Sequence, residues 1–168
     1  MFTSLQSAQS QTTQAVYVPK EPEVSDIDPA ILLSETNNHR VANGLTPVTI
    51  NQKLNLSALT KCSDMVARNY WSHNDPNGAE PWHFLSDAGY TYTYAGENQF
   101  YTRHVSNSKE VIDDLYASPT HKANIIKPNY MEVGFGVCKS EAYVGQDKYG
   151  SGQEAVIVVQ HFGRPYGQ

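Results

Sequence analysis

The sequence is short of charged residues and of long apolar runs. Only 17% of its 168 residues are charged, and 17 acidic against 12 basic side chains leave a net charge of −5. A negative chain has no general attraction for nucleic acid, so no nucleic-acid partner is expected. No apolar stretch approaches the length of about 20 residues that crosses a bilayer, so the sequence predicts no transmembrane segment.

Cysteine is scarce as well, since Cys62 and Cys138 are the only two in the chain. Neither has the Cys-x-x-Cys spacing of redox and zinc sites, which argues against a metal held by cysteine. The two can form one disulfide in an oxidising compartment or remain as two buried thiols. The sequence leaves both alternatives open.

The first residues of the chain lack the features of a secretory signal. They contain neither a basic region nor a continuous apolar stretch, which fits an intracellular protein or a secreted one whose signal has been removed. Polar residues, proline and acidic residues dominate positions 1–27, a composition that buries too little apolar surface to fold alone. We therefore expect residues 1–27 to form a disordered or extended tether and residues 28–168 to form one domain.

Capping residues and hydrophobic patterns predict helices first and strands last. A helix is expected to start at Asp28-Pro29 and to end near Ala42, and Asn51 is expected to cap a second helix through about Asn69. The remaining expected elements are short helices over 81–89, 108–117 and 118–126 and strands over 131–138 and 155–162. Because helices and strands do not alternate, this order predicts an α+β fold with an antiparallel sheet.

Three side chains are candidates for chemistry because each is expected in a loop. His73 lies among turn-forming residues, Glu97 lies in the tyrosine-rich stretch Tyr90–Tyr101, which we expect to be irregular, and His121 follows a Ser-Pro pair. Two imidazoles and a carboxylate can bind a metal or perform acid–base catalysis where the fold brings them together. Their spacing matches no local metal motif, so residues that merely tie loops together fit equally well.

Several motifs then follow one another in a characteristic order. They are Glu35-Thr36-Asn37-Asn38-His39-Arg40, Ser72-His73, Ala95-Gly96-Glu97-Asn98, Ser118-Pro119-Thr120-His121-Lys122-Ala123-Asn124-Ile125 and Glu132-Val133-Gly134-Phe135-Gly136. This ordered set resembles the CAP superfamily, which comprises cysteine-rich secretory proteins, antigen 5 and pathogenesis-related 1 proteins. Within that superfamily it is most similar to the bacterial SCP-domain branch, and the resemblance covers roughly residues 29–163.

The resemblance implies an α-β-α sandwich, in which a central antiparallel sheet lies between helical layers beside an open cleft. Matched to the family's motifs, His73 and His121 take the places of the two cleft histidines, and Glu97 takes the place of an acid. These three are the candidate catalytic residues. A second acid found in eukaryotic relatives has no secure match. The family also implies a secreted, periplasmic or cell-surface location.

The first functional expectation from the resemblance is a cleft that binds a ligand. His73 and His121 would hold a divalent metal, with Zn²⁺ as the expected ion, and Glu97 would orient them or accept a proton. A small apolar or lipid-like molecule is the expected ligand. The other residues expected at the ligand are Trp71, Tyr94, Asn98 and Asn124.

Two further functions remain open. The first is a hydrolase that acts on peptide or cell-wall material with a metal-activated or histidine-activated water. The second is a non-catalytic module that binds a host or cell-surface protein. The resemblance alone does not decide among the three, because one fold carries many chemistries.

Overall fold

The computed structural model describes residues 27–103, 107–145 and 153–167. The elements in chain order are α1 (Pro29–Ala42), β1 (Thr49–Ile50), α2 (Gln52–Ala67), α3 (Trp82–Asp87), β2 (Tyr92–Thr102), α4 (Ser108–Ala117), α5 (Pro119–Ile125), β3 (Glu132–Tyr143) and β4 (Gln153–Pro165). Apart from Ile27, the expected tether over residues 1–27 lies outside the described residues. In the described segments, no helix is both long enough and apolar enough to cross a membrane.

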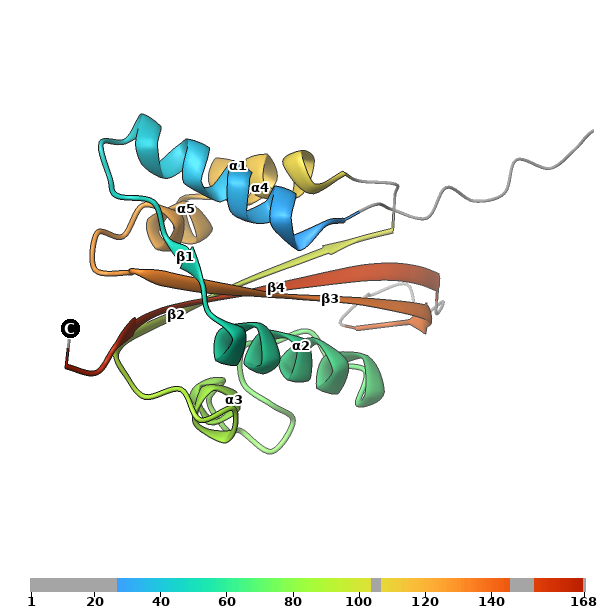
Figure 1. Cartoon of the computed structure of the whole chain (residues 1–168). Helices are drawn as coiled ribbons and strands as arrows, with labels where there is room; N and C mark the ends of the chain where they lie inside the picture. Colours follow the sequence, from blue (N-terminus) through green and yellow to red (C-terminus); the bar gives the residue numbers. More distant parts are fainter. Residues whose placement is uncertain (1–26, 104–106, 146–152, 168) are drawn as a thin grey trace, which may run out of the picture.

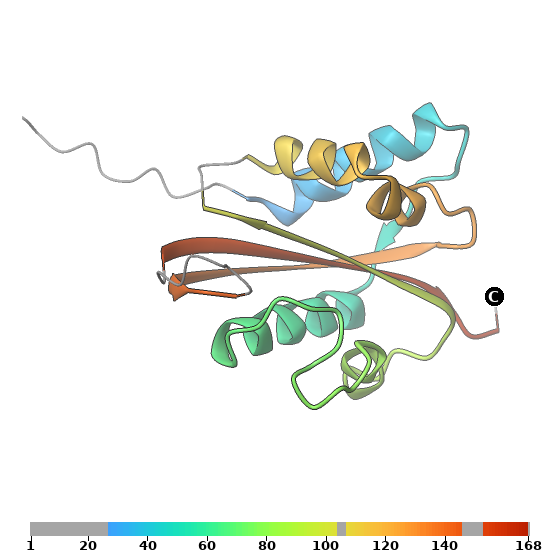
Figure 2. The same ribbon diagram turned by 180° about the vertical axis from the view of Figure 1, so that it is seen from behind.

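One sheet lies at the centre of the molecule, with the strand order β1-β3-β4-β2. The three long strands are antiparallel neighbours, and β1 adds a two-residue parallel pairing to β3. Helices α1, α4 and α5 cover one face of this sheet, and α2 and α3 cover the other (Figures 1 and 2). The expected α-β-α sandwich is confirmed.

The two long helices begin where the sequence predicts, because polar side chains cap them. The Asp28 carboxylate accepts a hydrogen bond from the backbone N–H of Ala30, and Pro29 occupies the first helical position. The Asn51 side chain accepts in the same way from Lys53. Each cap pairs a backbone donor that the first helical turn would otherwise leave without a partner.

The Tyr90–Tyr101 segment corrects one expectation, since most of it is a strand rather than an irregular stretch. Strand β2 pairs with β4 along its length. Its central residues Glu97, Asn98 and Gln99 are all buried although all are polar, so the alternation of apolar residues that marks a strand is missing. This pairing places Glu97 directly opposite His161.

Helix α2 lies directly on β3 and β4. A Cβ atom at Gly134 would collide with the backbone of Leu54, and one at Gly136 would collide with the backbone of Ala58. Glycine at these two positions of β3 therefore allows the helix to approach the sheet closely. This approach brings the inner face of α2 to the site described below.

A disulfide bond joins Cys62 of α2 to Cys138 of β3. The alternative of two buried thiols is therefore wrong. The bridge closes a sequence separation of 76 residues, and a cross-link over such a distance stabilises a fold chiefly by restricting the unfolded chain.

Candidate functional site

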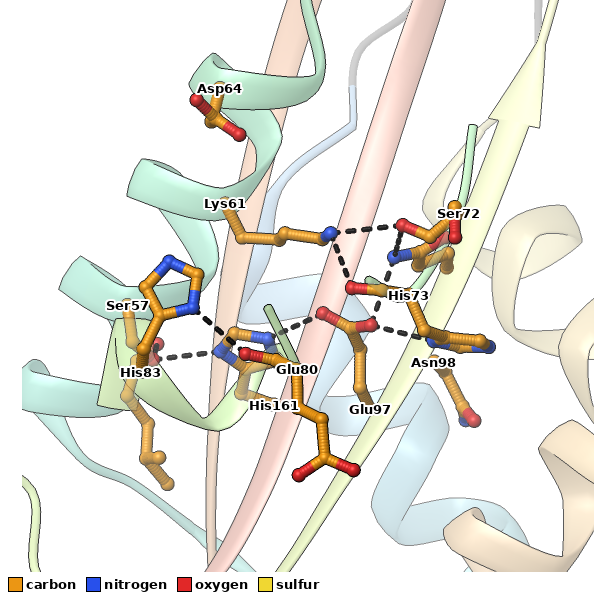
Figure 3. Close-up of polar contacts among 12 residues, drawn as sticks. Ser57, Lys61, Asp64, Ser72, His73, Glu80, His83, Glu97, Asn98 and His161 are labelled. Atoms are coloured by element: carbon orange, nitrogen blue, oxygen red, sulfur yellow. Dashed lines mark hydrogen bonds and ion pairs between the residues drawn. The ribbon is translucent and has the colours of Figure 1, made fainter. Parts of the chain in front are cut away.

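Glu97 lies at the centre of the site, in the middle of β2 (Figure 3). Its side chain is only 1% exposed. His73 Nδ1 and Gln99 Nε2 lie 2.6 Å and 2.9 Å from its Oε1, and His161 Nε2 lies 2.8 Å from its Oε2. Three side chains thus surround one carboxylate.

These contacts keep Glu97 ionised. Burial alone would raise the pKa of Glu97, because a low-dielectric environment disfavours charge. The hydrogen bonds from His161 and His73 and the positive charge of Lys61 outweigh burial, and the pKa lies below its ordinary value. An ionised carboxylate can only accept hydrogen bonds, which assigns protons to His73 Nδ1 and His161 Nε2.

His73 belongs to the loop between α2 and α3, and its side chain is 57% exposed. Because Nδ1 donates to Glu97, the neutral ring carries its free lone pair on Nε2. A carboxylate that fixes the tautomer of a histidine in this way also fixes the ring orientation. His73 is therefore prepared to bind a metal or accept a proton at one defined atom.

The loop that carries His73 is anchored by a buried lysine. Lys61 of α2 is 0% exposed, and burial lowers its pKa. Its ammonium donates to the backbone oxygens of Ser72 at 2.9 Å and His73 at 2.7 Å and to the Tyr70 hydroxyl at 3.1 Å. Gln99 Nε2 reaches the Ser72 oxygen as well, at 3.1 Å. These bonds hold the His73 backbone beside Glu97.

A hollow of about 370 Å³ opens beside these residues. Its walls come from the loop that leads into α3 and from the end of α5 with the turn that follows it. The lining side chains include His73, Glu97, Trp82, Asn124, Lys127 and Tyr130. The hollow therefore combines the His73–Glu97 pair with two aromatic rings and one cation.

His121 lies near the start of α5 and is half-buried. Burial lowers the pKa of His121, and the nearby His73 imidazole, when protonated, lowers it further, which favours a neutral His121 ring. It does not line the hollow, and across the described residues its ring takes part in no hydrogen bond. The structure thus brings His73 and Glu97 into direct contact and leaves His121 within electrostatic reach of His73.

The two expected asparagines hold α5 against the sheet. Asn98 is 0% exposed, and its amide donates to the backbone oxygen of His121 at 3.1 Å and to Gln160 Oε1 at 3.0 Å. Asn124 Nδ2 donates to Asn98 Oδ1 at 2.9 Å and to the Glu97 backbone oxygen at 3.0 Å. Asn124 lines the hollow, whereas Asn98 is fully buried and does not; a ligand contact by either asparagine stays a prediction.

The two expected aromatic residues lie outside the hollow. Trp71 packs on Tyr101, with ring centroids 5.6 Å apart, and Tyr94 is 43% exposed with the Lys127 ammonium 5.9 Å from its ring centre. Neither lines the hollow, and their expected role as ligand contacts stays a prediction. Trp82 supplies an aromatic wall instead.

Sequence reasoning also missed His161, which lies in an apolar strand with no motif around it. The residue is 0% exposed, and its Nδ1 lies 2.8 Å from the hydroxyl oxygen of Ser57 on α2. Ser57 is itself 0% exposed, so it cannot serve as a nucleophile for a ligand in the hollow. The signal that finds His161 is strand register, because Glu97 pairs with it across β2 and β4.

Comparison with known proteins identifies the family. The model of the cysteine-rich secretory protein family, CAP, matches residues 33–162. The chain belongs to this family. A relative of this CAP domain, the YkwD protein of Bacillus subtilis, is 33% identical over 105 residues, which cover 62% of this chain and 40% of YkwD. The match thus spans less than half of that relative.

Solved structures of other proteins share the CAP fold. An extracellular protein containing an SCP domain, from Bacillus anthracis, is similar with a TM-score of 0.64 and 21% identity, over 81% of this chain and 40% of that one. An outer surface protein of Borrelia burgdorferi has a TM-score of 0.63 and 18% identity, over 81% of this chain and 91% of that one. With the family match, these neighbours support the bacterial SCP branch.

Of the three candidate residues, the two histidines keep donor atoms that could hold a divalent metal. Both oxygens of Glu97 already accept hydrogen bonds, and the described ranges contain no group of three or more His, Cys, Asp and Glu side chains placed around one ion. These donor atoms are His73 Nε2 and the ring nitrogens of His121, which take part in no hydrogen bond within the described ranges. Two imidazoles completed by water make a weak, exchangeable site with open positions.

Proposed function

We propose that this CAP domain acts outside the cell or at its surface, where it binds a small ligand in the hollow beside Glu97. His73 and His121 would hold a divalent metal such as Zn²⁺ at the binding site. The location is supported by two structural neighbours, one described as extracellular and the other as an outer surface protein.

The observation that carries this proposal is the 2.6 Å hydrogen bond between His73 Nδ1 and Glu97 Oε1. It leaves Nε2 of an oriented imidazole available to a metal or ligand. The neutral ring of His121 is the second nitrogen donor. When bound, the metal would supply open coordination positions for an oxygen or nitrogen atom of the ligand. The rings of Trp82 and Tyr130 suit the apolar part of a small or lipid-like molecule.

Calorimetric titration with Zn²⁺ tests the metal-binding part of the proposal. We expect wild-type protein to bind the ion and His73→Ala to bind it at least about 10-fold more weakly. His39→Ala is the matched control, because His39 pairs with Asp113 and stacks on Tyr116, outside the site. Equal heats for wild type and His73→Ala would remove the metal from the proposal.

The same hydrogen bond favours hydrolysis of peptide or cell-wall material as a second candidate function. An imidazole oriented by a carboxylate is a general base that can take a proton from water. We expect wild type to cleave cell-wall fragments or peptides. Glu97→Gln should cleave the same substrates at least about 100-fold more slowly. Undiminished cleavage by the variant, or none by wild type, counts against this function. A non-catalytic interaction module would leave partner binding unchanged in both Glu97→Gln and His73→Ala.

A further inference from the structure

His161 and His73 lie on opposite sides of the Glu97 carboxylate (Figure 3). His73 is at the exposed side, whereas His161 is completely buried on β4. Both ring nitrogens of His161 have partners, Glu97 Oε2 at 2.8 Å and Ser57 Oγ at 2.8 Å. A ring held at both nitrogens has one orientation, set by the strand that carries it and by the helix that carries Ser57.

The four side chains form a continuous path of hydrogen bonds from the inner face of α2 to the hollow. Ser57 contacts His161, His161 contacts Glu97, and Glu97 contacts His73. Each comes from a different part of the chain, namely α2, β4, β2 and the loop after α2. His73 at the surface is thus linked through Glu97 to His161 and Ser57, two buried residues that do not line the hollow.

We propose that His161 is a positioning residue that holds the Glu97 carboxylate in the orientation in which it accepts the Nδ1 proton of His73. The terminal torsion of a glutamate side chain is broad and easily turned. His73 and Gln99 both bind Oε1, and among the residues that the structure describes His161 supplies the hydrogen bond to Oε2. Without that bond, a buried charged oxygen loses its partner and the carboxylate turns to find another.

Two matched variants separate the contacts of His161. In His161→Gln, the amide nitrogen lies about as far along the side chain as imidazole Nε2, so the variant keeps a donor for Glu97 and loses the contact with Ser57. In His161→Asn, the amide lies where Nδ1 was, so the variant keeps a partner for Ser57 and loses the donor to Glu97. Both variants replace the buried imidazole ring by a smaller side chain, so both leave a similar packing defect.

The readout is the tautomer of His73, measured from its ring ¹⁵N chemical shifts in metal-free protein. We expect the Nδ1–H tautomer in wild type and His161→Gln, and a mixture with Nε2–H in His161→Asn. An unchanged His73 spectrum in His161→Asn overturns the proposal, and so does an equal change in both variants, because a purely space-filling role predicts one of these results. If a variant fails to fold, wild type still decides: the His161 Nε2 proton must exchange slowly with solvent, and rapid exchange contradicts the proposal.

This inference rests on the proposed function only in assuming that His73 Nε2 meets the ligand. Zn²⁺ affinity is therefore measured separately on the same proteins, with an expected loss of about 10-fold in His161→Asn and less in His161→Gln. If the tautomer changes as expected while wild type fails to bind Zn²⁺, the metal proposal fails and the positioning role stands. If Zn²⁺ binds and the tautomer is insensitive to both variants, the positioning role fails alone.

Discussion

Glu97 and His73 form a 2.6 Å hydrogen bond in which the carboxylate is almost fully buried and the imidazole is mostly exposed. The buried partner fixes the exposed one. This arrangement leaves His73 Nε2 available to a ligand, because the hydrogen bond to Glu97 uses the other ring nitrogen.

Replacing Glu97 by Gln tests the charge on this pair. We expect the variant to lose about 1–3 kcal/mol of unfolding free energy at neutral pH, because an amide cannot accept all the hydrogen bonds that the carboxylate accepts. The folded-state pKa of Glu97 is lowered, so its contribution is complete above the ordinary pKa of about 4.3 and is lost as the pH falls through the lower folded value.

Urea unfolding across acidic pH measures this dependence. The stability difference between wild type and Glu97→Gln should shrink as the pH falls below the ordinary carboxyl range. Glu141→Gln is the control, since Glu141 is exposed on β3, and it should follow wild type throughout. A difference in unfolding free energy between wild type and Glu97→Gln that stays constant down to the lowest pH would contradict an ionised Glu97 in the folded state.

Lys61→Met tests the anchor of the His73 loop. Methionine keeps most of the apolar stem but leaves the carbonyl oxygens of Ser72 and His73 without the ammonium. We expect a loss of about 1–3 kcal/mol in chemical unfolding and weaker binding of Zn²⁺. Lys53→Met, which removes one exposed hydrogen bond to Gly89, should change little; similar losses in both variants would argue against a specific anchor.

An NMR titration of His121 tests its proximity to His73. Burial and the neighbouring His73 both lower its pKa, so we expect a midpoint below the ordinary value of about 6.5. In His73→Ala the midpoint should rise part of the way, because burial is the larger cause and remains. His83→Ala should leave it unchanged. If the His121 midpoint is the same in wild type and His73→Ala, the two rings lie too far apart to share a metal.

Gly134→Ala tests the close approach of α2 to the sheet. The added methyl group would meet the backbone of Leu54 and Asn55, and a rigid helix cannot yield locally. We expect a loss of about 1–3 kcal/mol or more in thermal or urea unfolding. Lys139→Ala, at an exposed position of the same strand, should have little effect. Equal stability of Gly134→Ala and wild type would mean that α2 lies farther from β3.

The helices could be predicted from the sequence because their signals are local. Asp28-Pro29 and Asn51 cap α1 and α2 within one turn of each helix start, and no distant residue changes that geometry. Strand β2 gave no such signal, since its inward-facing residues include Glu97 and Gln99 rather than apolar side chains. Because the site needs polar residues in this strand, β2 lacks the alternation of apolar residues by which a strand is recognised.

The site could be predicted only in part, for a related reason. Motif resemblance found His73, Glu97 and His121, but it could not show which of them touch. His161 belongs to no motif. It meets Glu97 only through the register between β2 and β4, which pairs these two residues across a sequence separation of 64. Lys61 gave no signal either, because a lysine in an amphipathic helix is normally exposed.

The most direct test of the binding site is a Zn²⁺ titration followed through the ring nitrogens of the histidines by ¹⁵N NMR. The account predicts that His73 Nε2 and one nitrogen of His121 shift as the ion is added, while His73 Nδ1 keeps its proton and still donates it to Glu97. Shifts confined to other histidines, or displacement of the Nδ1 proton by the metal, would contradict it.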